Sequence, residues 1–189
     1  MKVLMVCTGN LCRSPMAEAL LRHAVQQCGC DIEVASVGTW AHRGHPAMPE
    51  AVAVMAALGV ELDDHLSRPV ELAELREADV VVAMTSVHRK ELLQLAPEIE
   101  PKLVLLKELT ELAVEGELPA TAEARIERLL GASRPKWRRA LDLDDPIGKP
   151  MGAYEKTAAE IQMAVEVLVD ALCDNKNPAE EAARLDSTP

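Results

Sequence analysis

Val3-Leu4-Met5-Val6-Cys7-Thr8-Gly9-Asn10-Leu11-Cys12-Arg13-Ser14-Pro15 stands near the start of the chain. Its apolar run 3–6 is typical of a buried strand, and residues 16–22 have the composition and apolar spacing of a helix. Ser14 is a favourable N-cap, and Pro15 suits the first helical position, where an N–H would be unpaired in any case. Between strand and helix lies a tight loop whose backbone N–H groups can converge. Such a loop predicts an anion site, because free donors and the helix dipole both favour negative charge.

Cys7 and Arg13 mark the two ends of this loop. Backbone N–H donors, a helix N-terminus and a guanidinium all stabilise a thiolate. The planar fork of Arg13 matches two oxygens of a phosphate at once. A thiolate beneath a bound tetrahedral oxyanion predicts covalent phosphoryl transfer. A structural cysteine beside a surface arginine would explain Cys-x5-Arg alone, but the strand, Gly9, Asn10 and the Ser-Pro pair favour the functional interpretation.

Composition limits the class of protein. The chain has 189 residues, 49% of them hydrophobic, which fits one compact domain. A net charge of −11 disfavours binding to nucleic acid or to an anionic membrane. No apolar run approaches a transmembrane length, and the first strand is unlike a signal peptide. The loop amides and Arg13 suffice for an anion's charge, so we expect no metal and no cofactor.

The five cysteines follow no disulfide framework. An odd number without regular spacing indicates a reducing compartment, so we expect a cytoplasmic protein. Cys28 and Cys30 lack further ligands at zinc spacing, and we interpret them as small buried thiols at a helix end. We expect Cys173 to lie in the core at the end of the last helix.

Strands alternate with helices along the rest of the chain. The pattern predicts strands at 32–36, 78–84 and 102–106, and helices at 47–58, 70–77, 86–95 and 152–173. This order predicts an α/β three-layer sandwich, with a parallel sheet between helices. Ligands bind such sheets beyond the carboxyl ends of the strands, where the strand order reverses, and the loop after the first strand is so placed.

A second motif, Asp142-Leu143-Asp144-Asp145-Pro146-Ile147-Gly148, concentrates carboxylates in a short loop. Phosphoryl transfer from an ester needs a proton for the leaving oxygen, and this loop is the best source of a general acid. On composition alone, a solvated acidic turn explains the loop equally well.

The first motif resembles the phosphate-binding loop of the low-molecular-weight protein tyrosine phosphatases. Bacterial protein-arginine phosphatases and thioredoxin-coupled arsenate reductases share this loop. The resemblance implies a four-stranded parallel sheet of flavodoxin-like (Rossmann-like) topology and a phosphorylated protein as substrate. It also implies that phosphate or another oxyanion is bound by Thr8, Gly9, Asn10, Leu11, Cys12, Arg13 and Ser14. Family members carry Asp-Pro on a mobile loop, so the acid is assigned to Asp145, which would later activate the water that hydrolyses the cysteinyl phosphate.

Several residues are expected to support the loop. Gly9 and Asn10 are residue types that tolerate positive φ. The resemblance implies that Asn10 is held by hydrogen bonds with Ser14, Ser36 and the imidazole of His65, which makes His65 structural and not a base. Ser14 is expected to donate to the thiolate of Cys7.

Cys12 has two interpretations that the residues leave open. Its proximity to Cys7 in a tight loop would allow a disulfide, and the resemblance implies that such a neighbour protects the nucleophile from irreversible oxidation. Alternatively, Cys12 packs beneath the loop as a small apolar side chain.

The positions of the cysteines bear on which reaction the site catalyses. Arsenate-reducing relatives need two further cysteines to relay a disulfide, and none lies between Cys30 and Cys173, so arsenate reduction is disfavoured. A binding module that kept the loop without turnover is disfavoured because Cys7, Arg13, Ser14 and Asp145 are all present.

Tyrosine and arginine phosphate remain, with tyrosine favoured. Leu11 suits a phenyl ring, whereas the arginine-specific relatives carry Thr there. Against this, Ile147 and Gly148 replace the aromatic that tyrosine enzymes place after Asp-Pro, and residues 83–86 are more similar to the arginine phosphatases. Leu11, Trp40 and Ile147 form the predicted substrate pocket, in which Trp40 is either an aromatic wall or a half-exposed loop anchor.

The predicted domain spans 1–175, followed by a polar tail at 176–189. It departs from the family by a charged insertion at about 111–141, with a helix at 121–130 and a basic patch at 134–139. We interpret the insertion as a lid over the anion site. A solvated helix packed on the sheet edge is the alternative.

Overall fold

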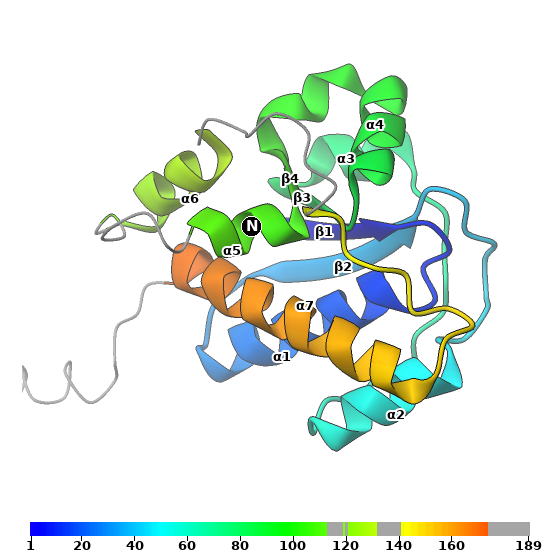
Figure 1. Cartoon of the computed structure of the whole chain (residues 1–189). Helices are drawn as coiled ribbons and strands as arrows, with labels where there is room; N and C mark the ends of the chain where they lie inside the picture. The colour runs from blue at the N-terminus through cyan, green and yellow to red at the C-terminus, as the bar shows by residue number, and fades with distance from the viewer. Residues whose placement is uncertain (113–118, 120, 132–140, 174–189) are drawn as a thin grey trace, which may run out of the picture.

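Four parallel strands form the centre of the protein in the order β2-β1-β3-β4 (Figure 1). The computed structural model describes residues 1–112, 119, 121–131 and 141–173. The strands are β1 (Lys2–Cys7), β2 (Glu33–Gly38), β3 (Val80–Ala83) and β4 (Leu103–Leu105). After β2 the chain crosses to the other side of β1, so the strand order reverses beside β1. The end of β1, where Cys7 lies, is therefore at the position where such sheets bind ligands, and the predicted flavodoxin-like fold is confirmed.

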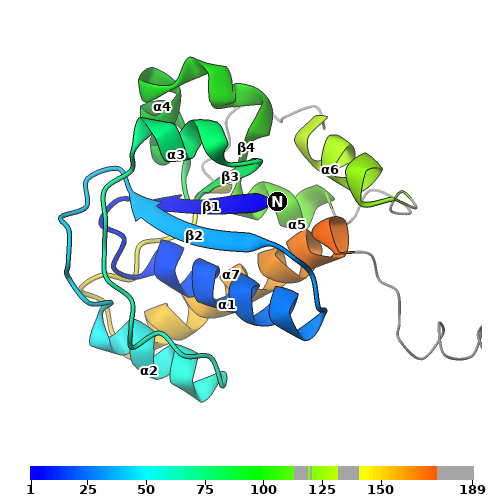
Figure 2. The same cartoon turned by 180° about the vertical axis from the view of Figure 1, so that it is seen from behind.

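Helices cover both faces of this sheet. They are α1 (Arg13–Gln27), α2 (Pro49–Ala57), α3 (Leu72–Glu77), α4 (Ser86–Leu95), the 3-10 helix η1 (Pro97–Lys102), α5 (Leu106–Leu112), α6 (Ala122–Gly131) and α7 (Met151–Leu172). Helices α1, α2 and α7 lie on one face, and α3 and α4 lie on the other (Figures 1 and 2). The three-layer arrangement is the one that the sequence pattern predicted.

The alternation of side chains along β1 supplies both hydrophobic cores. Val3 and Met5 pack in the larger core with α1 and α7, and Leu4 and Val6 pack in the smaller core with α3 and α4. Both faces of β1 are thus buried, as a central parallel strand requires. Tyr154 of α7 is fully buried in the larger core.

Most predicted elements are confirmed, with β3 and β4 shorter than expected. Helices η1 and α5 were not predicted, because two prolines and a three-residue strand leave little periodic signal there. Helix α6 confirms the helix expected at 121–130. The basic patch at 134–139 and the tail at 176–189 lie outside the described residues, so the lid stays a prediction.

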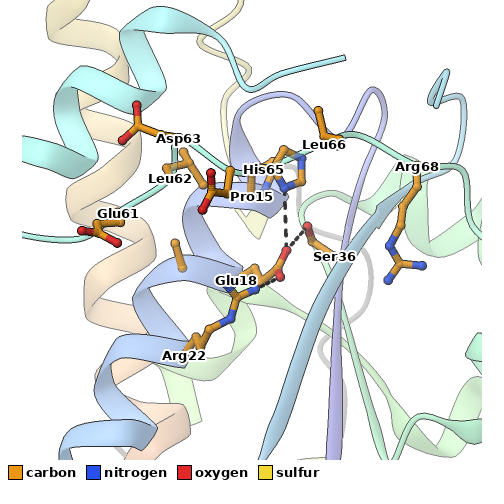
Figure 3. A pocket seen from close by; sticks show the side chains of 12 residues that line it. Pro15, Glu18, Arg22, Ser36, Glu61, Leu62, Asp63, His65, Leu66 and Arg68 are labelled. Carbon is orange, nitrogen blue, oxygen red and sulfur yellow. Dashed lines mark hydrogen bonds and ion pairs between the residues drawn. The ribbon is translucent and has the colours of Figure 1, made fainter. Parts of the chain in front are cut away.

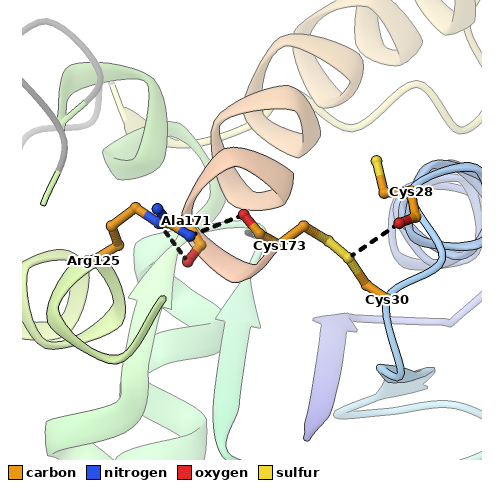
Figure 4. The surroundings of a disulfide bond; sticks show 5 residues. All are labelled: Cys28, Cys30, Arg125, Ala171 and Cys173. Atoms are coloured by element: carbon orange, nitrogen blue, oxygen red, sulfur yellow. Dashed lines mark hydrogen bonds between the residues drawn. A yellow bond between two sulfur atoms is a disulfide. The ribbon is translucent and has the colours of Figure 1, made fainter. Parts of the chain in front are cut away.

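The expectation of small buried thiols at Cys28 and Cys30 is wrong, whereas Cys173 lies in the core as expected. Cys30 and Cys173 form a disulfide with Cα atoms 6.0 Å apart, and Cys28 is exposed (Figure 4). The fold brings the end of α7 beside the start of β2, a proximity that a sequence separation of 143 conceals. Arg125 of α6 binds the same end of α7, donating to the carbonyl oxygens of Ala171 and Cys173 (Figure 4).

No helix in the described part of the chain is both long enough and apolar enough to cross a membrane.

Candidate active site

The loop between β1 and α1 surrounds the sulfur of Cys7. This side chain is 3% exposed, and its Sγ lies 3.0 Å from the hydroxyl of Ser14 and 3.3 Å from the backbone nitrogen of Asn10. The prediction that Ser14 caps the helix is wrong, because α1 already begins at Arg13 and its N-cap, Cys12, makes no side-chain cap. The Ser14 hydroxyl faces Cys7, so it is placed to stabilise a negative sulfur.

Asn10 determines the shape of the loop. Its φ of 54° is the only positive φ of a non-glycine residue in the described chain. The side-chain amide donates to the hydroxyls of Ser14 (3.0 Å) and Ser36 (2.8 Å), and its oxygen accepts from the backbone N–H of Arg68 (2.9 Å). These bonds compensate the left-handed backbone. Gly9, expected to share this conformation, does not adopt a positive φ.

His65 contacts the backbone of the loop through its imidazole. Its Nε2 lies 2.8 Å from the carbonyl oxygen of Asn10, and since that oxygen can only accept, Nε2 carries the proton. Burial lowers the pKa of His65, which keeps the ring neutral. His65 is therefore placed as a structural donor.

Glu18 completes this support and was missed by sequence reasoning. Its carboxylate accepts from the hydroxyl of Ser36 and from Arg22, in a pocket of about 490 Å³ that His65 also lines (Figure 3). Neither Cys7 nor Asp145 lines this pocket, so it lies behind the anion site. The sequence contained one signal for this role. Glu18 follows Ser14 by one helical turn, so the two side chains lie on the same face of α1.

The three carboxylates of the acidic loop, residues 142–148, each contact a different partner. Asp145 lies against Arg13, with Nη2 2.5 Å from Oδ2, and Arg13 also donates to the carbonyl oxygen of Leu143. Asp144 faces Lys156 at 3.8 Å. Asp142 accepts from the backbone N–H of Ser86, the first residue of α4. Of the three, Asp145 is thus the carboxylate beside the guanidinium of the loop.

Cys12 lies beneath the loop against Tyr154. Both Cys7 and Cys12 are free and buried. Burial raises the pKa of Cys12 to about 12, with the negative charges of Cys7 and Asp145 acting in the same direction. Cys12 is therefore a protonated thiol at neutral pH, in contrast to the reactive role assigned to Cys7.

The predicted substrate pocket is only loosely assembled. Trp40 is 72% exposed, donates from Nε1 to Glu91, and is held near the loop by its backbone N–H, which donates to the carbonyl oxygen of Thr8. Ile147 is exposed and Leu11 is partly buried against the larger core. Trp40 is thus more exposed than the half-exposed anchor that was one of its two interpretations, and its role in a pocket stays a prediction.

Gly38 was missed as well, and it limits how the loop can pack. A Cβ at this position would overlap the carbonyl oxygen of Thr8 and lie 2.8 Å from Cβ of Ala41 and 3.0 Å from the nitrogen of Asn10. Only glycine therefore allows β2 to approach the phosphate-loop backbone this closely.

Gly38→Ala is expected to destabilise the fold by about 2–3 kcal/mol, because backbone on both sides must shift. The urea midpoint should fall, and the KM for an aryl phosphate should rise as the loop distorts. Gly152→Ala is the matched control, since its nearest neighbour is a flexible side-chain oxygen at 4.0 Å. Equal stability of the two variants would contradict this packing.

Within the described residues, no group of three His, Cys, Asp or Glu could hold a metal ion. A buried cysteine in contact with a hydroxyl and a backbone amide, in a loop that leads into a helix beginning with arginine, is the arrangement of the cysteine-dependent phosphatases.

Comparison with known proteins agrees with this class. The family model for low molecular weight phosphotyrosine protein phosphatase matches residues 2–120, and the chain belongs to this family.

Relatives include both substrate classes. The low molecular weight protein-tyrosine-phosphatase Wzb of Salmonella typhi is 34% identical over 79% of this chain and 98% of its own length. The protein-arginine-phosphatase of Bacillus subtilis is 36% identical over 57% of this chain and 71% of its own. The crystal structure of the low molecular weight protein tyrosine phosphatase from T. tengcongensis superposes with a TM-score of 0.72 at 34% identity, covering 91% of this chain and 99% of that one.

Proposed function

We propose that this phosphatase dephosphorylates phosphotyrosine in proteins, through a cysteinyl-phosphate intermediate on Cys7. The contacts of Cys7 Sγ with the hydroxyl of Ser14 and the backbone N–H of Asn10 carry the proposal. A cytoplasmic location is part of the proposal, because a thiolate nucleophile must stay reduced.

In the first step, the thiolate of Cys7 attacks phosphorus while the bond to the tyrosyl oxygen breaks. Asp145 supplies the proton that this oxygen takes as it leaves. Arg13 and the loop amides bind the phosphoryl oxygens, whose charge is spread out in the transition state.

In the second step, Asp145 accepts a proton from a water molecule as that water attacks phosphorus. The sulfur–phosphorus bond breaks, and the thiolate returns with the Ser14 hydroxyl 3.0 Å away to stabilise it. Inorganic phosphate is released and the enzyme is regenerated. Hydrolysis of p-nitrophenyl phosphate in reducing buffer tests the activity, and a purified protein without turnover would overturn the proposal.

Phosphoarginine is the second candidate substrate. Exposed Ile147 stands where the tyrosine enzymes place an aromatic, and the Bacillus subtilis relative named as a protein-arginine-phosphatase supports this alternative. Side-by-side turnover of phosphotyrosine and phosphoarginine peptides decides between the two.

Leu11→Thr is expected to lower kcat/KM for the phosphotyrosine peptide about tenfold, because a methyl contact with the phenyl ring is exchanged for a hydroxyl. Turnover of the phosphoarginine peptide should rise relative to it. Leu11→Val is the matched control, since valine has nearly the shape of threonine without the hydroxyl. A native protein that already prefers phosphoarginine would contradict the assignment from Leu11.

A further inference from the structure

His88 connects the phosphate loop with helix α4 through two short hydrogen bonds. Its Nε2 lies 2.8 Å from the hydroxyl of Thr8, the residue that follows Cys7, and its Nδ1 lies 2.8 Å from the hydroxyl of Thr85. Thr85 is the N-cap of α4. His88 is 3% exposed, so its ring is buried, and both bonds are part-buried because Thr8 lies at the surface.

One tautomer of His88, in which Nδ1 accepts and Nε2 donates, satisfies every hydrogen bond of this connection. Thr85 Oγ1 accepts the backbone N–H of His88 at 3.4 Å, so its own hydroxyl hydrogen is free to donate to Nδ1. Nε2 then carries the ring proton and donates to Thr8 Oγ1. Thr8 keeps its hydroxyl hydrogen for the anion that the loop binds.

The imidazole is neutral at physiological pH. Burial lowers the pKa of His88 to about 4, and the guanidinium of Arg13 acts in the same direction. Glu91, Asp142 and Asp145 also face the ring and oppose this shift, but they do not outweigh burial. A neutral ring fits the donor and acceptor roles at its two nitrogens.

Residues 84–88, at the start of α4, also bind the segment that carries Asp145. The backbone N–H and hydroxyl of Ser86 donate to Asp142 at 2.6 and 3.0 Å. The backbone N–H of Leu143 donates to the carbonyl oxygen of Met84 at 2.9 Å. Residues 84–88 therefore bind the phosphate loop on one side and the acid segment on the other.

We propose that His88 is a positioning residue for phosphoryl transfer, which holds Thr8 beside the nucleophile and keeps the phosphate loop in register with the acid segment. It acts through Thr8 and does not touch the phosphate. The inference rests on the proposed function of Cys7 and Asp145.

Two amide substitutions separate the bonds of His88. The side-chain nitrogen of glutamine takes a position similar to Nε2, whereas asparagine reaches only as far as Nδ1. His88→Gln is expected to keep kcat/KM for p-nitrophenyl phosphate within about threefold. His88→Asn should lose about 10- to 100-fold, mostly in kcat, as small displacements of reacting groups do. Equal losses in the two variants would overturn the proposal.

A double-mutant cycle tests whether His88 acts through Thr8. Thr8 is exposed, so Thr8→Val is expected to fold while losing only the hydroxyl. If the two residues act through one bond, Thr8→Val with His88→Asn should be no slower than the slower single variant. If the losses of kcat/KM in the two single variants instead multiply in the double variant, His88 acts independently of Thr8, and the inference is refuted.

Wild-type activity separates this inference from the proposed function. An inactive wild-type protein would defeat the proposed function itself. An active wild type with an unimpaired His88→Asn variant would defeat the role of His88 alone.

Discussion

Cys7→Ser is expected to lower kcat for p-nitrophenyl phosphate on the order of 10⁴- to 10⁶-fold, the loss seen when an enzyme's covalent nucleophile is removed. A serine hydroxyl stays protonated at neutral pH, so it cannot attack phosphorus as the thiolate does. Arg13 and the loop amides remain, so the variant should still bind inorganic phosphate. Steady-state kinetics and calorimetric titration with phosphate measure the two effects.

Cys28→Ser is the control for the cysteine experiment. Cys28 is free and exposed at the end of α1, away from the loop, and its replacement should leave turnover unchanged. Activity that survives Cys7→Ser would refute the covalent mechanism. Loss of phosphate binding together with activity would indicate that the loop itself had collapsed.

Asp145→Asn is expected to slow hydrolysis of phenyl phosphate by about 10²- to 10⁴-fold, the usual contribution of a general acid. The loss in kcat/KM, which reports only the first step, should be much smaller for p-nitrophenyl phosphate, because nitrophenolate leaves readily without a proton. The ratio of kcat/KM for the two substrates therefore measures proton donation to the leaving group, and a change in overall stability would leave that ratio unaltered.

Asp144→Asn is the matched control for the acid. Asp144 is exposed and faces Lys156, so its amide variant should keep kcat within about twofold for both substrates, as is usual for surface charges. If Asp144→Asn instead shows the leaving-group effect, the acid has been assigned to the wrong carboxylate.

Contacts local in sequence were predictable from the residues themselves, whereas contacts made by folding were predicted only where the family resemblance supplied them. Cys7, Asn10 and Arg13 belong to one short loop, so their proximity follows from a strand that runs into a helix. The positive φ of Asn10 was predictable because few residue types tolerate it. The helix start was mispredicted because the Ser14 hydroxyl faces Cys7, and local capping preference carries no information about that tertiary contact.

Two further remote supports of the site, Gly38 and His88, needed the sheet order before they could be found. Gly38 and His88 reach the loop because β2 and β3 flank β1. Each looks ordinary in its own segment, a glycine at a strand end and a histidine in a helix. The disulfide of Cys30 was missed for the same reason, since its partner lies at the far end of the chain.

That disulfide makes most of the enzyme a covalent ring. The bond joins Cys30 and Cys173 across a sequence separation of 143, and the ring that it closes includes β2, β3, β4 and the acid segment but leaves Cys7 outside. Chain-entropy arguments give such a closure about 5 kcal/mol of stabilisation, because the unfolded chain loses conformations. Oxidation of Cys30 and Cys173 thus stabilises the fold, whereas Cys7 must stay reduced to act as the nucleophile. An oxidising environment would therefore raise the stability of the enzyme and lower its activity.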